Sequence, residues 1–142
     1  MKIVALVARI LLGLIFFVFG LNGFLHFIPA TLPPGMAGQF LVALVASHYS
    51  YLVFAVQLIA GVLLLVNRFV PLAVVLLGAE LANILAFHIT LLPDGAAPAV
   101  VATILWLIVA YDVRGTLRTL LVSKVSAGAG VSASGEPVRS ER

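Results

Sequence analysis

Five polar side chains that could bind a ligand or carry a proton lie in or at the end of long apolar stretches of this sequence. Asn22 and His26 stand four residues apart in "LNGFLHFIP", and Glu80, Asn83 and His88 follow one another in "GAELANILAFHITLLPDG". Such groups are costly inside a lipid bilayer, and where they occur they often mark ligand sites or proton pathways. These residues are therefore the first candidates for a functional role.

Amide and imidazole groups beside aromatic walls suit a quinone, whose carbonyls need only one or two hydrogen-bond donors. The residues that fit a quinone or other ligand contact are Asn22, His26, Asn83, Phe87 and His88. Two histidines at comparable depth would also fit a haem or a metal ion. No second carboxylate lies near them in the sequence, so no metal site is predicted, and haem is disfavoured. The alternative is that the histidines cap helix ends and contact interfacial water.

A second pair of groups, Arg9 and Glu80, falls deeper in the apolar stretches. From the expected helix starts their backbones differ by about 7 Å in depth, which an extended arginine spans. We therefore predict an intramembrane polar pair between Arg9 and Glu80. Three alternatives stay open: Arg9 reaches the inner headgroups, Arg9 pairs with Asp112, or Glu80 carries a proton and no charge.

Small residues and one amide predict where helices approach each other. Gly13 and Gly20 lie seven residues apart in the first stretch, and Gln57 and Gly61 lie four apart in the second. Glycine lets helix backbones pack closely in a membrane. We expect these four residues to face other helices, with the Gln57 amide hydrogen-bonded to a neighbour.

The composition indicates a membrane protein. Hydrophobic residues make up 63% of the 142 residues and charged residues only 9%, whereas soluble domains carry about 25% charged residues. The chain cannot cover a water-facing surface, so its first partner is the lipid bilayer. It has no cysteine, which excludes thiolate nucleophiles and iron–sulfur clusters.

The hydropathy pattern predicts an all-α polytopic membrane protein, because a spanning helix needs about 20 mostly apolar residues. The expected spans are 3–28, 49–66, 69–92 and 96–113. The prolines after the first span break the helix, and 36–46 is predicted to form a short interfacial helix between spans one and two. A four-helix transmembrane domain is thus expected over 1–125. The small, polar residues 126–142 are expected to form a flexible cytoplasmic tail.

Charge predicts the topology. The basic residues outside the spans are Lys2, Arg68, Arg114, Arg118, Lys124, Arg139 and Arg142. The connections that join the first span to the second and the third to the fourth contain no lysine or arginine. By the positive-inside rule both termini are cytoplasmic, and all three histidines face the outer side. The net charge of +3 is therefore interpreted as a topology signal, and no nucleic-acid partner is predicted.

Two stretches resemble the DoxX family of small bacterial membrane proteins. They are "ARILLGLIFFVFGLNGFLHFIP" and "LIAGVLLLVNRFVPLAVVLLGAELANILAFHITLLPDG". The resemblance implies a four-helix bundle in the bacterial inner membrane and a link to quinone-dependent redox assemblies. Related members often carry proline or valine where this chain has Ala79 and Glu80, so a role for Glu80 is not implied by the resemblance.

Three functions are compatible with these observations. The leading hypothesis is an accessory subunit of a membrane redox or respiratory assembly, which would bind quinone or stabilise a larger partner complex, or would form a homo-oligomer. The alternative is a small transporter or proton-relay element that uses Arg9, Glu80 and the outer histidines. A stand-alone enzyme ranks last, since no set of nucleophile, base and orienting group can be recognised in the sequence.

Overall fold

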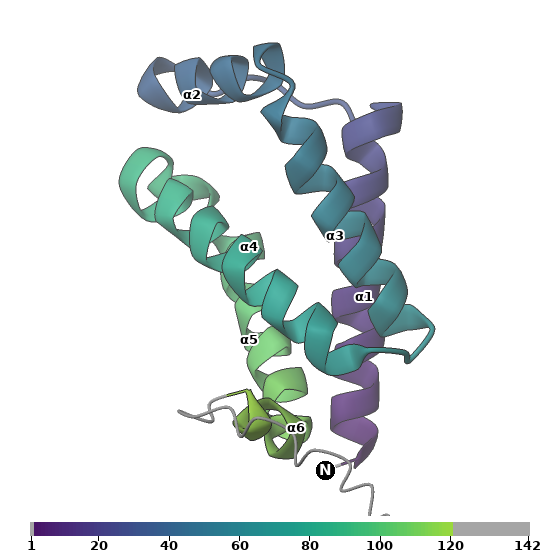
Figure 1. Ribbon diagram of the computed structural model, residues 1–142. Coiled ribbons are helices and arrows are strands. Elements are labelled where there is room, and N and C mark those ends of the chain that lie inside the picture. Colours follow the sequence, from purple (N-terminus) through teal and green to yellow (C-terminus); the bar gives the residue numbers. More distant parts are fainter. Residues whose placement is uncertain (1, 121–142) are drawn as a thin grey trace, which may run out of the picture.

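The computed structural model describes residues 2–120, and these residues form six α-helices and one short 3-10 turn without any β-strand (Figure 1). The helix bounds agree with the expected spans to within three residues. The expected tail at 126–142, with its basic residues, lies outside the described residues.

Helix α1 (Lys2–Leu25) ends three residues earlier than predicted. The cause is a cap formed by Asn22. Its side-chain oxygen accepts a hydrogen bond from the backbone N–H of Ile28 at 2.6 Å, and its carbonyl accepts one from the N–H of His26 at 2.8 Å. His26 itself takes a left-handed conformation with φ of 53°, which turns the chain out of the helix.

Helix α2 (Gly35–Ala46) lies across one end of the molecule (Figure 1). It is bent by 86° from helix α3 (Tyr49–Leu65). The bend lies at Ser47 and His48, where His48 has a φ of 61°. This geometry agrees with the predicted short helix between the first two spans.

Helix α4 (Val70–Leu91) follows a tight turn and carries Pro71 in its first turn, a position where proline costs no hydrogen bond. The turn η1 (Pro93–Gly95) leads into helix α5 (Ala97–Asp112), which is followed by helix α6 (Arg114–Thr119). The sequence did not predict α6 as a separate helix.

Four helices form a ring of neighbours, in which α1 packs on α3, α3 on α4, α4 on α5 and α5 on α1. The centre of the ring is apolar, and its largest completely enclosed side chains are Leu12, Leu64, Leu77 and Val74. Helix α4 diverges from α1 and α3 towards the end that α2 covers (Figure 1).

Two helices, α1 and α4, are long and apolar enough to cross a membrane, and α2 with α3 would make a third span if the bent pair is counted as one. Helix α5 is apolar but has only 16 residues, which gives a length of about 24 Å. Large apolar side chains cover the outer surfaces of the helices, as lipid contact requires. The described chain is thus all-helical and has two to three helices able to cross a membrane.

Candidate polar sites in the helical bundle

Glu80 lies at the contact between α4 and α3. Its half-buried carboxyl group lies near the side-chain amide of Gln57 on α3. Gln57 is buried and only 7% exposed. Glu80 is ten residues beyond Val70, about 15 Å along the helix axis and close to its middle. This site therefore joins a carboxyl group to an amide in the interior of the bundle.

The predicted pair between Arg9 and Glu80 is not formed. Arg9 lines a cavity of about 310 Å³ together with Val70 and Asp112, so it lies level with the first turn of α4. Glu80 is about 15 Å further along that helix, beyond the reach of the guanidinium. The sequence-based depth estimate assumed that the two helices start at the same level, whereas Arg9, seven residues into α1, lines the same cavity as Val70, the first residue of α4. The structure brings Arg9 and Asp112, one of the alternatives, to the same cavity.

Asn22 and His26 lie at the end of α1, where the amide of Asn22 caps the helix. His26 is exposed and follows the last helical residue. On α4, the amide of Asn83 donates to the carbonyl of Ala79 in its own helix at 2.9 Å. His88 Nδ1 lies 3.2 Å from the carbonyl oxygen of Leu92 at the end of the same helix.

The expected quinone-contact residues therefore fall into two separate groups. The end of α1, with Asn22 and His26, is on one side of α3, and the end of α4, with Phe87 and His88, is on the other (Figure 1). His26 and His88 do not converge on one site. Phe87 instead packs on Phe40 of α2 with ring centres 5.7 Å apart, and on His88 at 5.3 Å.

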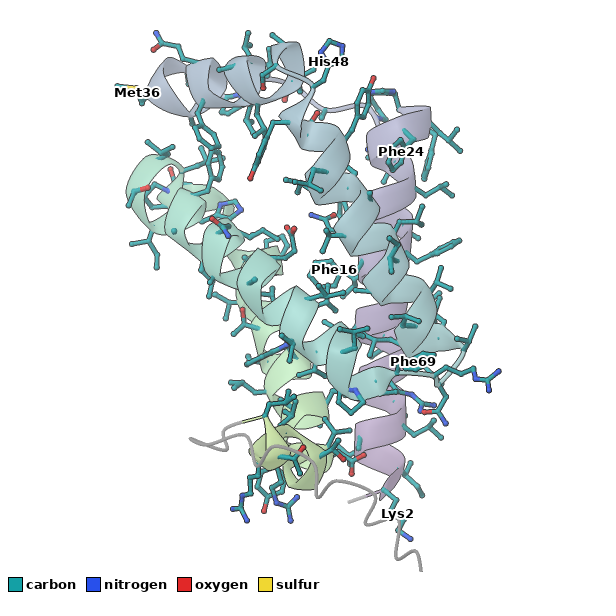
Figure 2. The ribbon with its side chains drawn as sticks, in the orientation of Figure 1. Lys2, Phe16, Phe24, Met36, His48 and Phe69 are labelled. Atoms are coloured by element: carbon teal, nitrogen blue, oxygen red, sulfur yellow. The ribbon has the colours of Figure 1, made fainter. Side chains whose placement is uncertain are left out.

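The third histidine, His48, lies at the bend between α2 and α3 and is labelled in Figure 2. Its ring is 5.7 Å from that of Tyr51. Within residues 2–120, no three His, Asp or Glu side chains gather closely enough to hold a metal ion.

The three glycines expected to mediate helix packing lie at the contact between α1 and α3. A Cβ atom on Gly20 would lie 2.6 Å from the backbone nitrogen of Leu58, and one on Gly61 would lie 2.6 Å from that of Phe17. A Cβ atom on Gly13 would lie 3.0–3.2 Å from side-chain atoms of Leu64 and Leu65. Only glycine allows the two backbones to approach this closely.

One polar contact was not anticipated from the sequence. The indole N–H of Trp106 on α5 donates to the backbone carbonyl of Val74 on α4 at 2.8 Å. Gly78 makes room for the ring, because a Cβ there would lie 3.0 Å from it. The signal that could have revealed it is a lone tryptophan in an apolar span, whose N–H needs a buried acceptor.

Comparisons of this chain with known protein families, with characterised proteins and with solved structures find no match. The geometry of the polar groups is therefore the basis for the functional inference.

Proposed function

We propose that this chain is a four-span membrane protein of DoxX type in the bacterial inner membrane, with both termini in the cytoplasm. In this proposal it is a non-catalytic subunit of a larger, quinone-linked redox assembly. The observation that carries the proposal is the second half of α4, from Ala82 to Leu91, in which no residue is buried within the described chain.

The two halves of α4 differ in burial. The first half supplies five buried residues to the core, from Val70 to Leu81, whereas no residue from Ala82 to Leu91 is buried. Within this second half Asn83 is exposed, and its amide makes one hydrogen bond, to its own helix. An amide has further donor and acceptor capacity, which hydrocarbon cannot satisfy. A partner helix that covers this face would satisfy it.

The phenyl ring of Phe87 and the half-buried Glu80 border the same half of the helix. A quinone headgroup held between this face and a partner subunit would find an amide donor and an aromatic wall there. This arrangement replaces a site made within one chain, because the end of α1, which carries Asn22 and leads into His26, lies on the far side of α3.

The proposal is tested by purification from native membranes in a mild detergent, followed by identification of bound proteins and quantification of extracted quinone. We expect a discrete larger complex. Ala82→Trp and Ala86→Trp, on the exposed face of α4, should release the chain from it. The control Ile104→Trp, at an exposed position of α5, should leave the complex intact. A folded chain that runs alone, without partner or quinone, would contradict the proposal.

A second candidate, a proton-relay element, is favoured by the carboxyl group of Glu80 beside Gln57 in the interior of the bundle. In liposomes with an internal pH dye, this function requires proton flux that Glu80→Gln abolishes and Glu80→Asp partly retains. Both variants should keep the helical content of the parent protein. Equal flux for the parent and Glu80→Gln would eliminate this candidate.

A further inference from the structure

The residues that line the cavity around Arg9 have no role in the two functions proposed above. Three parts of the chain line its volume of about 310 Å³: the first two turns of α1, the connection between α3 and α4 with the first residue of α4, and the end of α5. Its polar lining consists of Lys2, Arg9, Asn67 and Asp112, and the remaining lining is alanine, leucine and valine. The cavity lies at the end of the bundle where the labelled Lys2 is found (Figure 2).

The guanidinium of Arg9 is incompletely satisfied. Its Nε atom is buried and has no hydrogen-bond partner in the part of the chain that the structure describes. A buried N–H donor without a hydrogen-bond partner is energetically unfavourable, even though the Arg9 side chain as a whole is only half-buried. An anionic ligand in the cavity would remove this cost through charge-assisted hydrogen bonds.

The position of the cavity matches the headgroup layer of a membrane. Lys2 is at the first residue of α1, and Arg9 lies seven residues further, about 10 Å deeper along the axis. Beside them, Ile3 and Val4 are 77% and 56% exposed, as side chains in contact with lipid would be. A lipid could therefore place its headgroup in the cavity and its acyl chains along α1.

The charges of the lining select the kind of headgroup. Lys2 and Arg9 attract a phosphate, and the amide of Asn67 can donate to the same group. Asp112 repels a ligand that carries only negative charge, but it accepts hydrogen bonds from an ammonium group. A headgroup with a phosphodiester and a primary ammonium matches this lining, because the phosphodiester suits Lys2 and Arg9 and the ammonium suits Asp112.

We propose that this cavity binds the headgroup of phosphatidylethanolamine, with the phosphate on Arg9 and Lys2 and the ammonium on Asp112. The site does not depend on the proposed partner complex, because it lies at the opposite end of the bundle from the exposed half of α4.

The test is native mass spectrometry of the full chain in detergent, titrated with lipids of identical acyl chains. Phosphatidylethanolamine should bind about tenfold more tightly than phosphatidylcholine, because methylation of the amine removes the donors that Asp112 accepts. Asp112→Asn should lower the affinity for phosphatidylethanolamine to that for phosphatidylcholine. The control Asp94→Asn, at the other end of the bundle, should change neither affinity.

Arg9 is tested with two variants. Arg9→Gln should weaken binding of both lipids by about tenfold or more, since the phosphate loses its charged partner. If Arg9→Gln does not fold, Arg9→Lys keeps the charge, removes the Nε donor and should still weaken binding of both lipids. Unchanged binding in a folded Arg9 variant would overturn the proposal.

Two further outcomes would also overturn it. The first is equal affinity for the two zwitterionic lipids, or a preference for phosphatidylglycerol that Asp112→Asn leaves unaltered. The second is binding of soluble phosphoethanolamine as tight as that of the intact lipid, which would assign the cavity to a free phosphate compound.

Discussion

At the scale of single residues, the absence of a side chain decides how α1 and α3 meet. Gly20 and Gly61 each bring a backbone to within the distance where a Cβ would collide with the other helix. In a membrane, where lipid is as apolar as the helix surface, such close packing is a main source of association between helices. The contact between α1 and α3 is the most extensive in the bundle.

We expect Gly20→Ala to destabilise the bundle by about 1–3 kcal/mol, the usual cost of overpacking a close contact. The added Cβ would lie 2.6 Å from the backbone nitrogen of Leu58, so the helices must separate. The measurement is unfolding of the purified protein in mixed micelles of increasing denaturing detergent. Gly115→Ala in α6 is the matched control, because nothing lies within 4 Å of its added Cβ. Equal midpoints for the two variants would show that the close approach is not needed.

A second prediction at this scale concerns Trp106, the one tryptophan of the chain. Trp106→Phe removes the indole donor to the carbonyl of Val74 and should cost about 0.5–1.5 kcal/mol of stability. Gly78→Ala should alter the fluorescence emission of Trp106, because the added Cβ would press on the ring at 3.0 Å. Gly115→Ala, remote from the ring, should leave the emission unchanged. An unaltered spectrum in Gly78→Ala would contradict the described contact.

At the scale of elements, α2 is attached to the bundle by a small number of contacts. It continues into α3 through the bend at His48, and it contacts α4 through the ring pair Phe40 and Phe87. The exposed half of α4 is therefore supported mainly by α2 and by its own neighbour α5.

We expect Phe40→Ala to loosen α2 without unfolding the bundle. Loss of the ring contact removes about 0.5–1.5 kcal/mol beyond the area it buries. Hydrogen exchange should increase across 35–46 and near Phe87, with little change in α1. Val42→Ala, at an exposed position of the same helix, is the control. A uniform increase over the whole chain in Phe40→Ala would instead indicate global destabilisation.

The elements themselves could be predicted closely from the sequence. Apolar runs bounded by Pro29, Pro93 and the pair Asn67 and Arg68 place the helix ends within three residues. The largest difference, at the end of α1, arises from the side-chain cap of Asn22. Hydropathy carries no information about such a cap.

The candidate sites were predicted less well, because they depend on how helices are shifted and rotated against each other. Arg9 and Glu80 were matched in depth from assumed helix starts, yet Arg9 lies level with Val70. His26 follows the end of α1 and His88 lies in the last turn of α4, and these two helix ends lie on opposite sides of α3. Relative offset and tilt come from packing, for example at Gly20 and Gly61, and not from the apolar pattern of one helix.

At the scale of the whole molecule, polar groups gather at the two ends, and Glu80 and Gln57 lie between them. One end holds Lys2, Asp112 and the turn with Asn67, which line a common cavity. The other end holds α2 and the histidine at its bend (Figure 2). The number of membrane crossings depends on α5, which is apolar but has only 16 residues.

The chain contains no cysteine, so single cysteines can report the topology directly. We expect a membrane-impermeant maleimide to label Met36→Cys and Asp94→Cys in intact cells with the outer membrane opened. Thr119→Cys should react only after the inner membrane is also permeabilised. The three positions are exposed, and all three variants should react equally once the membrane is dissolved. If α5, at about 24 Å, does not cross, Asp94→Cys and Thr119→Cys will label from the same side, and the four-span topology must be abandoned.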